Sequence, residues 1–324
     1  MKLIREAQHG VGEGFCLIKS VEQKTTAKKQ AYLDMVLTDA QGEVSAKLWD
    51  YSPERHGRYE AGMVIKVRGS VDTWNNAPQL RIERIRHADD KDPVDMASLV
   101  PCAPYTSEWM FDQLTAMVDA MQNADIAAVV RGLLEQNRER ILICPAAVKM
   151  HHAVRSGLLY HTLSIARAAQ ALCAVYPFLN RDLVLAGVIL HDLDKIHELE
   201  VSQTGTASGY TVHGQLLGHL VGGVVGLERM GEQLGTPRET LELLQHMVLS
   251  HHAIPEFGSP IPPMFPEAEV VSALDTLDAT LYEMNAALEN VAAGQFTGKV
   301  WGLDRKLYQH GMASAEPGAK LDLD

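Results

Sequence analysis

The chain changes its hydrophobic periodicity once, near residue 90, and this change constrains its fold more than any other feature. Between residues 15 and 87, apolar and polar side chains alternate with a period of two, which predicts half-buried strands. From Thr106 to about His310, apolar residues recur with the period of a helix instead. We therefore expect a multi-domain α+β protein with a β domain over 1–90, a linker over 91–105, an all-α domain over 106–310 and a disordered tail over 311–324.

The β domain is expected to contain five short strands, at 15–18, 32–37, 44–49, 64–69 and 79–85. Turn-forming residues separate them, including Gly42, Gly62 and Asn75-Asn76. Five short strands with a break between the third and the fourth predict a small closed barrel, the OB-fold. The stretch 37–49, with its Leu-Thr-Asp start and Ala-Lys-Leu-Trp end, resembles the anticodon-binding type of OB domain.

Aromatic and basic side chains in this barrel are candidates for binding single-stranded nucleic acid, because bases stack on aromatic rings and phosphates pair with cations. The candidate substrate-binding residues here are Lys19, Lys47, Trp49 and Arg68. The alternative is that the aromatic residues are core or turn residues, and that the barrel contacts a protein.

In the helical half, His191-Asp192 ends the apolar run 184–190, which is typical of a buried helix. Burying an imidazole beside a carboxylate costs several kcal/mol unless both are compensated. A divalent metal ion compensates both, and Asp with His is a suitable ligand set for one. The pair therefore predicts a metal site in a helical core.

More candidate ligands lie in or next to segments that are predicted to be helices, at 158–175, 181–195, 215–234, 237–252 and 266–287. Ligands from several helices can converge in a bundle core and hold two metals. The candidate metal ligands are His161, His191, Asp192, His219, His251, His252 and Asp275. Asp278, one turn beyond Asp275, competes with it, and His251-His252 could instead serve only as a partner of a helix dipole.

The ordered set of His161, His191-Asp192 and Asp275 resembles the HD-domain metal-dependent phosphohydrolases, and the further histidines resemble the two-metal branch of that superfamily. Additional motifs resemble the YhaM-type 3′-to-5′ exoribonucleases, namely Gly-Leu-Leu-Tyr-His at 157–161, Leu-Leu-Gly-His at 216–219, Ser-His-His at 250–252, Glu-Phe-Gly-Ser-Pro at 256–260 and Gly-Gln-Phe-Thr at 294–297. The resemblance implies an OB-fold β-barrel followed by an all-α HD-domain helical bundle, and removal of 5′-mononucleotides from the 3′ end of single-stranded RNA.

Two metals about 3.5–4 Å apart can lower the pKa of a shared water from 15.7 towards about 7 and bind the phosphate. We expect Asp192 to bridge them, Lys195 to contact a phosphate oxygen, and His152 to line the site. The resemblance implies manganese most often, with iron, cobalt or magnesium as alternatives. Asp194 departs from the family, which usually has Gly there, and an extra carboxylate at that place would repel phosphate.

Three other functions stay open on these residues. An HD-type phosphohydrolase or phosphodiesterase of small or cyclic nucleotides would not need the OB-fold. A degenerate bundle could bind nucleic acid without catalysis, and a His/Asp site could also hold iron and activate oxygen.

Composition sets the remaining expectations. The net charge is −12, but residues 1–90 hold 14 Lys and Arg against 13 Asp and Glu, so the remainder of the chain carries −13. A near-neutral module is thus joined to an acidic one that suits metal cations. The four cysteines are scattered without any CxxC, which fits a reducing compartment. We expect a cytoplasmic protein without a membrane segment, with single-stranded RNA as partner, single-stranded DNA as an alternative partner, and a homo-oligomer compatible with the sequence.

Overall fold

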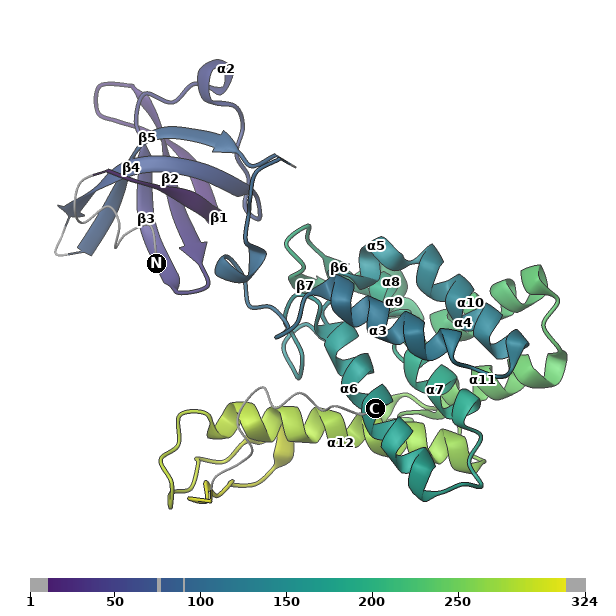
Figure 1. Cartoon of the computed structure of the whole chain (residues 1–324). Coiled ribbons are helices and arrows are strands. Elements are labelled where there is room, and N and C mark those ends of the chain that lie inside the picture. The colour runs from purple at the N-terminus through teal and green to yellow at the C-terminus, as the bar shows by residue number, and fades with distance from the viewer. Residues whose placement is uncertain (1–10, 75–76, 90, 313–324) are drawn as a thin grey trace.

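The computed structural model describes residues 11–74, 77–89 and 91–312, and it contains a barrel followed by a helical body (Figure 1). Most of the tail predicted to be disordered, from residue 313 onward, lies outside the described residues. The expected order of the two architectures along the chain is confirmed.

The N-terminal domain is a closed barrel with the strand order β1-β2-β3-β5-β4. All neighbouring strands are antiparallel except β3 and β5, which run parallel. Alternate residues point inward and form a core that includes Ile18, Met35, Leu37, Ile65 and Leu80. The strands are β1 (Val11–Thr25), β2 (Ala31–Asp39), β3 (Gly42–Leu48), β4 (Val64–Trp74) and β5 (Ala77–His87).

The expected break after the third strand contains a short helix, α2 (Pro53–His56). Farther on, the β4–β5 pairing contains a bulge between Arg68 and Gly69. A Cβ atom at Gly69 would lie 2.2 Å from the carbonyl oxygen of Arg81. Only glycine therefore allows the two backbones to approach this closely.

The segment after the barrel is anchored to both domains. The amide of Ala40 in the barrel donates to the carbonyl of Ser98, which lies in the 3₁₀ turn η1 (Met96–Ser98). Farther along, Arg155 of the helical body pairs with Pro101 and Ala103 through backbone hydrogen bonds. Leu99 and Val100 are buried here, so the region expected to be a linker is packed.

The helical body is built around one hydrophobic core, which includes the whole inner face of α7. The helix α7 follows α6, and α12 packs against both. The helices are α3 (Ser107–Asp119), α4 (Ala124–Gln136), α5 (Arg138–Ile141), α6 (Gly157–Val175), α7 (Arg181–Leu190), α8 (Lys195–Glu198), α9 (Val212–Leu216), α10 (Gly218–Leu234), α11 (Arg238–Ser250) and α12 (Pro266–Leu288). None of the helices in the described part of the chain is both long and apolar enough to cross a membrane.

Three local expectations were wrong. The helix expected over 181–195 ends at Leu190, and a turn follows before α8 begins. A small hairpin, β6 (Leu199–Val201) with β7 (Ala207–Tyr210), interrupts the all-α body. The segment from 289 to 310 is irregular, with one 3₁₀ turn and two isolated bridges, because its three glycines disfavour a helix.

Candidate metal centre and nucleic-acid face

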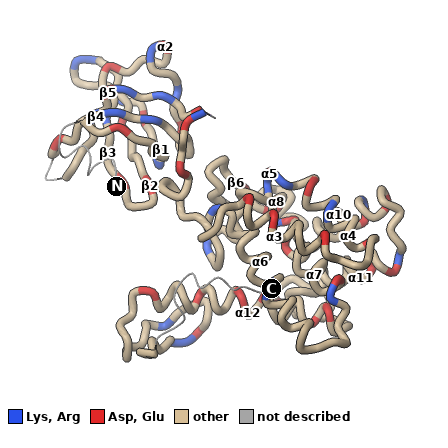
Figure 2. Tube along the Cα trace, viewed as in Figure 1, with Lys and Arg blue, Asp and Glu red and all other residues tan. Residues whose placement is uncertain are grey.

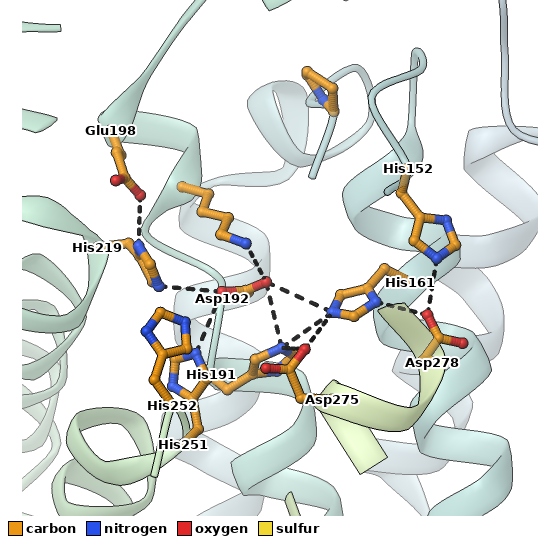
Figure 3. A network of polar contacts seen from close by, with 12 residues as sticks. His152, His161, His191, Asp192, Glu198, His219, His251, His252, Asp275 and Asp278 are labelled. Carbon is orange, nitrogen blue, oxygen red and sulfur yellow. Dashed lines mark hydrogen bonds and ion pairs between the residues drawn. The ribbon is translucent and has the colours of Figure 1, made fainter. Parts of the chain in front are cut away.

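The candidate metal centre lies where five helices of the body converge (Figure 3). His161 is on α6, His219 begins α10, and Asp275 is on α12, while His251-His252 directly follow α11. The His191-Asp192 pair directly follows α7, which begins with the Asn180 side chain accepting from the Leu183 amide. Because α7 is surrounded by apolar neighbours, the His191 and Asp192 side chains at its C-terminal end lie in the protein interior.

Asp192 is at the middle of this cluster and its two oxygens face different sets of histidines. Oδ2 lies 3.4 Å from Nε2 of His191 and 3.6 Å from Nε2 of His161. Oδ1 lies 3.3 Å from Nε2 of His219 and 3.6 Å from Nε2 of His251. A carboxylate in this position would be a ligand shared by both sets of histidines.

Asp275 and Asp278 both contact His161, but on opposite sides of its ring. Asp275 Oδ1 is 3.1 Å from Nε2, the nitrogen that faces Asp192. Asp278 Oδ2 is 2.8 Å from Nδ1, the nitrogen on the far side. Asp275 therefore faces the cluster around Asp192, and Asp278 lies on the far side of His161.

The five clustered histidines are each held by a partner of Nδ1, which leaves Nε2 directed inward. His191 donates to the Val188 carbonyl at 2.7 Å and His251 to the Val248 carbonyl at 2.8 Å. The other three partners are Asp278 for His161, Glu198 for His219 and the Phe257 carbonyl for His252. Such partners fix the tautomer and the orientation of a metal-ligating imidazole.

Burial and the carboxylates determine the protonation of the cluster. Burial disfavours the imidazolium of His161, but hydrogen bonds with Asp275 and Asp278 raise its pKa to about 9. Burial lowers the pKa of His251 to about 4, so this ring is neutral at pH 7. Despite its complete burial, Asp192 has a pKa well below its ordinary value because Lys195 and His191 stabilise the anion. The cluster thus holds an ionised Asp192 and a neutral His251, and a metal ion would displace the proton that Asp275 and Asp278 hold on His161.

The donor atoms fit divalent metal ions. Two groups share Asp192: the first adds His161, His191 and Asp275 to it, and the second adds His219, His251 and His252. A third group, His152, His161 and Asp278, lies beside the first, and within each group the donor atoms are within 4.8 Å of one another. Asp192 Oδ1, His219 Nε2 and His251 Nε2 are buried without a hydrogen-bond partner in the described part of the chain. Buried polar atoms are rarely left unpaired, and a cation would satisfy all three.

Comparisons with known proteins agree with this geometry. The HD domain family model matches residues 158–280, which span α6 to α12. The 3′-5′ exoribonuclease YhaM of Geobacillus sp. (strain WCH70) is 41% identical over 294 residues, which cover 91% of this chain and 90% of that protein. This chain belongs to the YhaM family of 3′-5′ exoribonucleases.

Two solved structures are similar to about a quarter of this chain. A replication protein A heterotrimer bound to ssDNA matches 25% of this YhaM-family chain and 59% of its own chain, with 14% identity and a TM-score of 0.21. The second OB-fold domain of replication protein A from Methanococcus maripaludis matches 26% of this chain and 87% of its own, with 12% identity and a TM-score of 0.20.

The residues expected to bind nucleic acid in this YhaM-family chain are spread over the barrel. Lys47 lies 5.1 Å from the ring centre of Tyr32 and 5.6 Å from that of Trp49, and the two rings are 4.7 Å apart. Lys19 pairs with Glu43 near the start of β3, at the opposite end of that strand from Lys47. Arg68 lies on β4. The structure therefore groups Lys47 with Trp49 and Tyr32, and leaves Lys19 apart.

Two other predicted site residues of this YhaM-family chain, His152 and Lys195, contact the carboxylates of the cluster. His152, expected to line the substrate site, is only 1% exposed and contacts Asp278 at 2.8 Å. The ring thus lies behind Asp278 and has little exposed surface. Lys195, expected to contact a phosphate oxygen, pairs with Asp192 Oδ2 at 2.6 Å.

Sequence reasoning missed the role of Glu198, which supports His219 from 21 residues away. The only signal was its place in the polar pair His197-Glu198 that ends the predicted helix. Such a pair is common at helix ends, so this signal could not identify the contact.

Proposed function

We propose that this chain is a metal-dependent 3′-to-5′ exoribonuclease that hydrolyses single-stranded RNA and releases 5′-mononucleotides. The proposal includes single-stranded DNA as a secondary substrate and a cytoplasmic location. The observation that carries it is the position of Asp192 between two groups of donor atoms, in a chain of the YhaM family.

We assign two divalent ions to the two groups, with Asp192 as their bridging ligand. When bound, the ions supply an activated water at neutral pH and stabilise negative charge on the phosphoryl oxygens. The five imidazoles argue against magnesium, which prefers oxygen ligands. Manganese accepts both donor types and is the first choice, followed by iron and cobalt.

Residues of the chain itself bind the phosphate and the terminal nucleotide. Lys195 is protonated, because Asp192 raises the pKa of its ammonium although burial alone would lower it. Its Nζ beside Asp192 is placed to pair with a non-bridging oxygen of a phosphate bound at the cluster. Gly258 and Phe257, next to His219 and His252, line a cavity of about 410 Å³, which we assign to the terminal nucleotide.

We assign binding of the RNA chain to the barrel. Tyr32 and Trp49 form an aromatic pair with Trp49 partly exposed, and Lys47 lies over both rings. Bases can stack on such rings while the ammonium pairs with phosphate. We expect Trp49→Ala to weaken binding of long RNA more than hydrolysis of a small phosphodiester. Equal losses on both substrates would remove the barrel from substrate binding.

The decisive experiment follows 5′-labelled single-stranded RNA with manganese, with a chelator, and with Asp192→Asn. We expect a ladder that shortens from the 3′ end only with metal and the intact carboxylate. The matched control is Asp194→Asn, whose carboxylate contacts His197 instead of the cluster. This control should keep the activity, and metal content measured by mass spectrometry should fall only in Asp192→Asn.

Two results would contradict the proposal. Full activity of a folded Asp192→Asn protein would place catalysis elsewhere. Uncut RNA in every reaction, with hydrolysis of a small or cyclic nucleotide, would establish the alternative phosphodiesterase.

A further inference from the structure

Like charges stand directly opposite each other at three register positions of the barrel, one on the β3–β5 pair and two on the β4–β5 pair. Lys47 on β3 is the register partner of Arg81 on β5. On the next pair of strands, the register places Arg68 opposite Arg84, and Lys66 opposite Arg86. Cations placed directly opposite in a sheet repel each other and destabilise it. Figure 2 shows the basic residues following one another along β4 and β5.

All of these side chains point away from the barrel core. Their strand neighbours Val67, Leu80 and Ile82 are buried inside, and alternation along a strand places the cations on the outer surface. Arg68, Arg81, Arg84 and Arg86 are exposed, and Lys47 and Lys66 are partly buried. The outer surface of β3, β5 and β4 therefore carries a continuous set of six cations, which we call the basic track: Lys47, Lys66, Arg68, Arg81, Arg84 and Arg86.

Carboxylates compensate only one part of the basic track. Glu13 pairs with Lys66 at 2.8 Å, and Asp92 binds Arg86 through both of its oxygens at 2.6 and 2.7 Å. Arg68 has a single distant partner, Glu83 at 3.8 Å. Within the described ranges, no carboxylate lies within 4 Å of Lys47, Arg81 or Arg84. Asp34, the register partner of Lys47 on β2, pairs with Lys24 at 2.7 Å instead, so charge without a close carboxylate is concentrated on β5 and its border with β3.

This uncompensated region is continuous with the aromatic pair. Lys47, which lies over Tyr32 and Trp49, is also the direct neighbour of Arg81 across the β3–β5 pairing. A strand of nucleic acid with bases on Tyr32 and Trp49 would therefore carry its phosphates past Lys47 toward Arg81 and Arg84. The strand order β2-β3-β5-β4 places these residues on successive neighbouring strands.

We propose that the basic track is a second RNA contact surface, on which Arg81 and Arg84 bind backbone phosphates of nucleotides beyond those that stack on Tyr32 and Trp49. This inference rests on the proposed function, because it extends the path of the same RNA substrate. A polyanion fits the track because it relieves the repulsion in the two pairs without a close carboxylate, Lys47–Arg81 and Arg68–Arg84, and exposed guanidinium groups bind phosphate through paired N–H donors.

The test measures binding and hydrolysis separately on the full chain. Binding of a labelled single-stranded RNA of about 24 nucleotides, longer than the ~4–16 that one OB-fold covers, is measured by fluorescence anisotropy in EDTA, so that no metal-dependent cleavage occurs. The variant is Arg81→Gln/Arg84→Gln. We expect affinity on the order of tenfold weaker, and a log–log salt slope smaller by about 1.4, since each lost phosphate contact on a single strand removes about 0.7.

The matched control is Lys28→Gln/Lys29→Gln, which removes the same charge from an exposed turn of the same barrel. This control should bind like the wild type, and both variants should hydrolyse an RNA of about 4 nucleotides at the wild-type rate, since it is too short to reach beyond one OB-fold site. Unchanged affinity and salt slope in the arginine variant would overturn the inference, as would equal losses in both variants.

Failure of the proposed function and failure of the inference about the basic track give different results. Absence of hydrolysis by the wild-type protein would refute the proposed function while the anisotropy still reports on the track. Retained RNA binding in the arginine variant with lost binding to vesicles that contain anionic lipid would overturn the inference in favour of a membrane surface.

Discussion

At the scale of single residues, Asp278 shows how a side chain outside a metal site can control it. One oxygen of Asp278 contacts both His161 Nδ1 and His152 Nε2 at 2.8 Å. An amide keeps an acceptor oxygen at this position but removes the negative charge that raises the pKa of His161 and with it the basicity of the ring as a ligand. We therefore expect Asp278→Asn to weaken metal binding about 10–100-fold, as measured by calorimetric titration with Mn²⁺. Glu269→Gln, an exposed position on the same helix, is the control, and equal affinities in the two variants would exclude this role for Asp278.

At the scale of elements, the contact between α8 and α10 depends on Asp194 and Gly222. A Cβ atom at Gly222 would lie 1.8 Å from Asp194 Oδ2, and the Asp194 side chain, only 13% exposed, is held by His197 at 2.8 Å. Gly222→Ala should therefore cost about 1–3 kcal/mol of unfolding free energy, as overpacking does. The same substitution should cost much less when Asp194→Gly removes the carboxylate. Urea unfolding of the four proteins in this double-mutant cycle measures the coupling, and equal costs in both backgrounds would show that the clash is relieved elsewhere.

At the scale of the whole molecule, the proposed metals should stabilise one domain and not the other. All donor groups identified in the described chain lie in the helical body, and a ligand at 100 times its Kd stabilises the folded state by about 2.7 kcal/mol. Calorimetry of the full chain should then show EDTA lowering the Tm of the helical body by about 5–10 °C while the barrel transition stays in place. Asp192→Asn should lose most of this EDTA effect, and an equal shift in both proteins would indicate a chelator effect unrelated to the cluster.

The two architectures and the five strands could be predicted because periodicity reports burial directly. The strands around Leu37 and Ile65 alternate with a period of two, and each was found within the observed β2 and β4. The end of α7 was misplaced by five residues because Leu193 and Ile196 continue an apolar pattern. A hydrophobic pattern indicates which residues are buried, not whether they are helical. The turn at His191-Asp192 is as buried as a helix would be, so the pattern could not reveal where α7 ends.

The sequence by itself determined which residue types meet in the core, since an Asp and several His at the ends of apolar helices are tolerable there only with compensation. Only the tertiary structure decided how they are used. The assignment of Asp275 to the cluster and Asp278 to the far nitrogen of His161 depends on the rotation of α12 against α6. The support of His219 by Glu198, the burial of His152 and the juxtaposition of Lys47 with Arg81 likewise depend on packing and strand register. These contacts join segments distant in sequence, so no local pattern encodes them, and the free energy of packing the whole chain selects them.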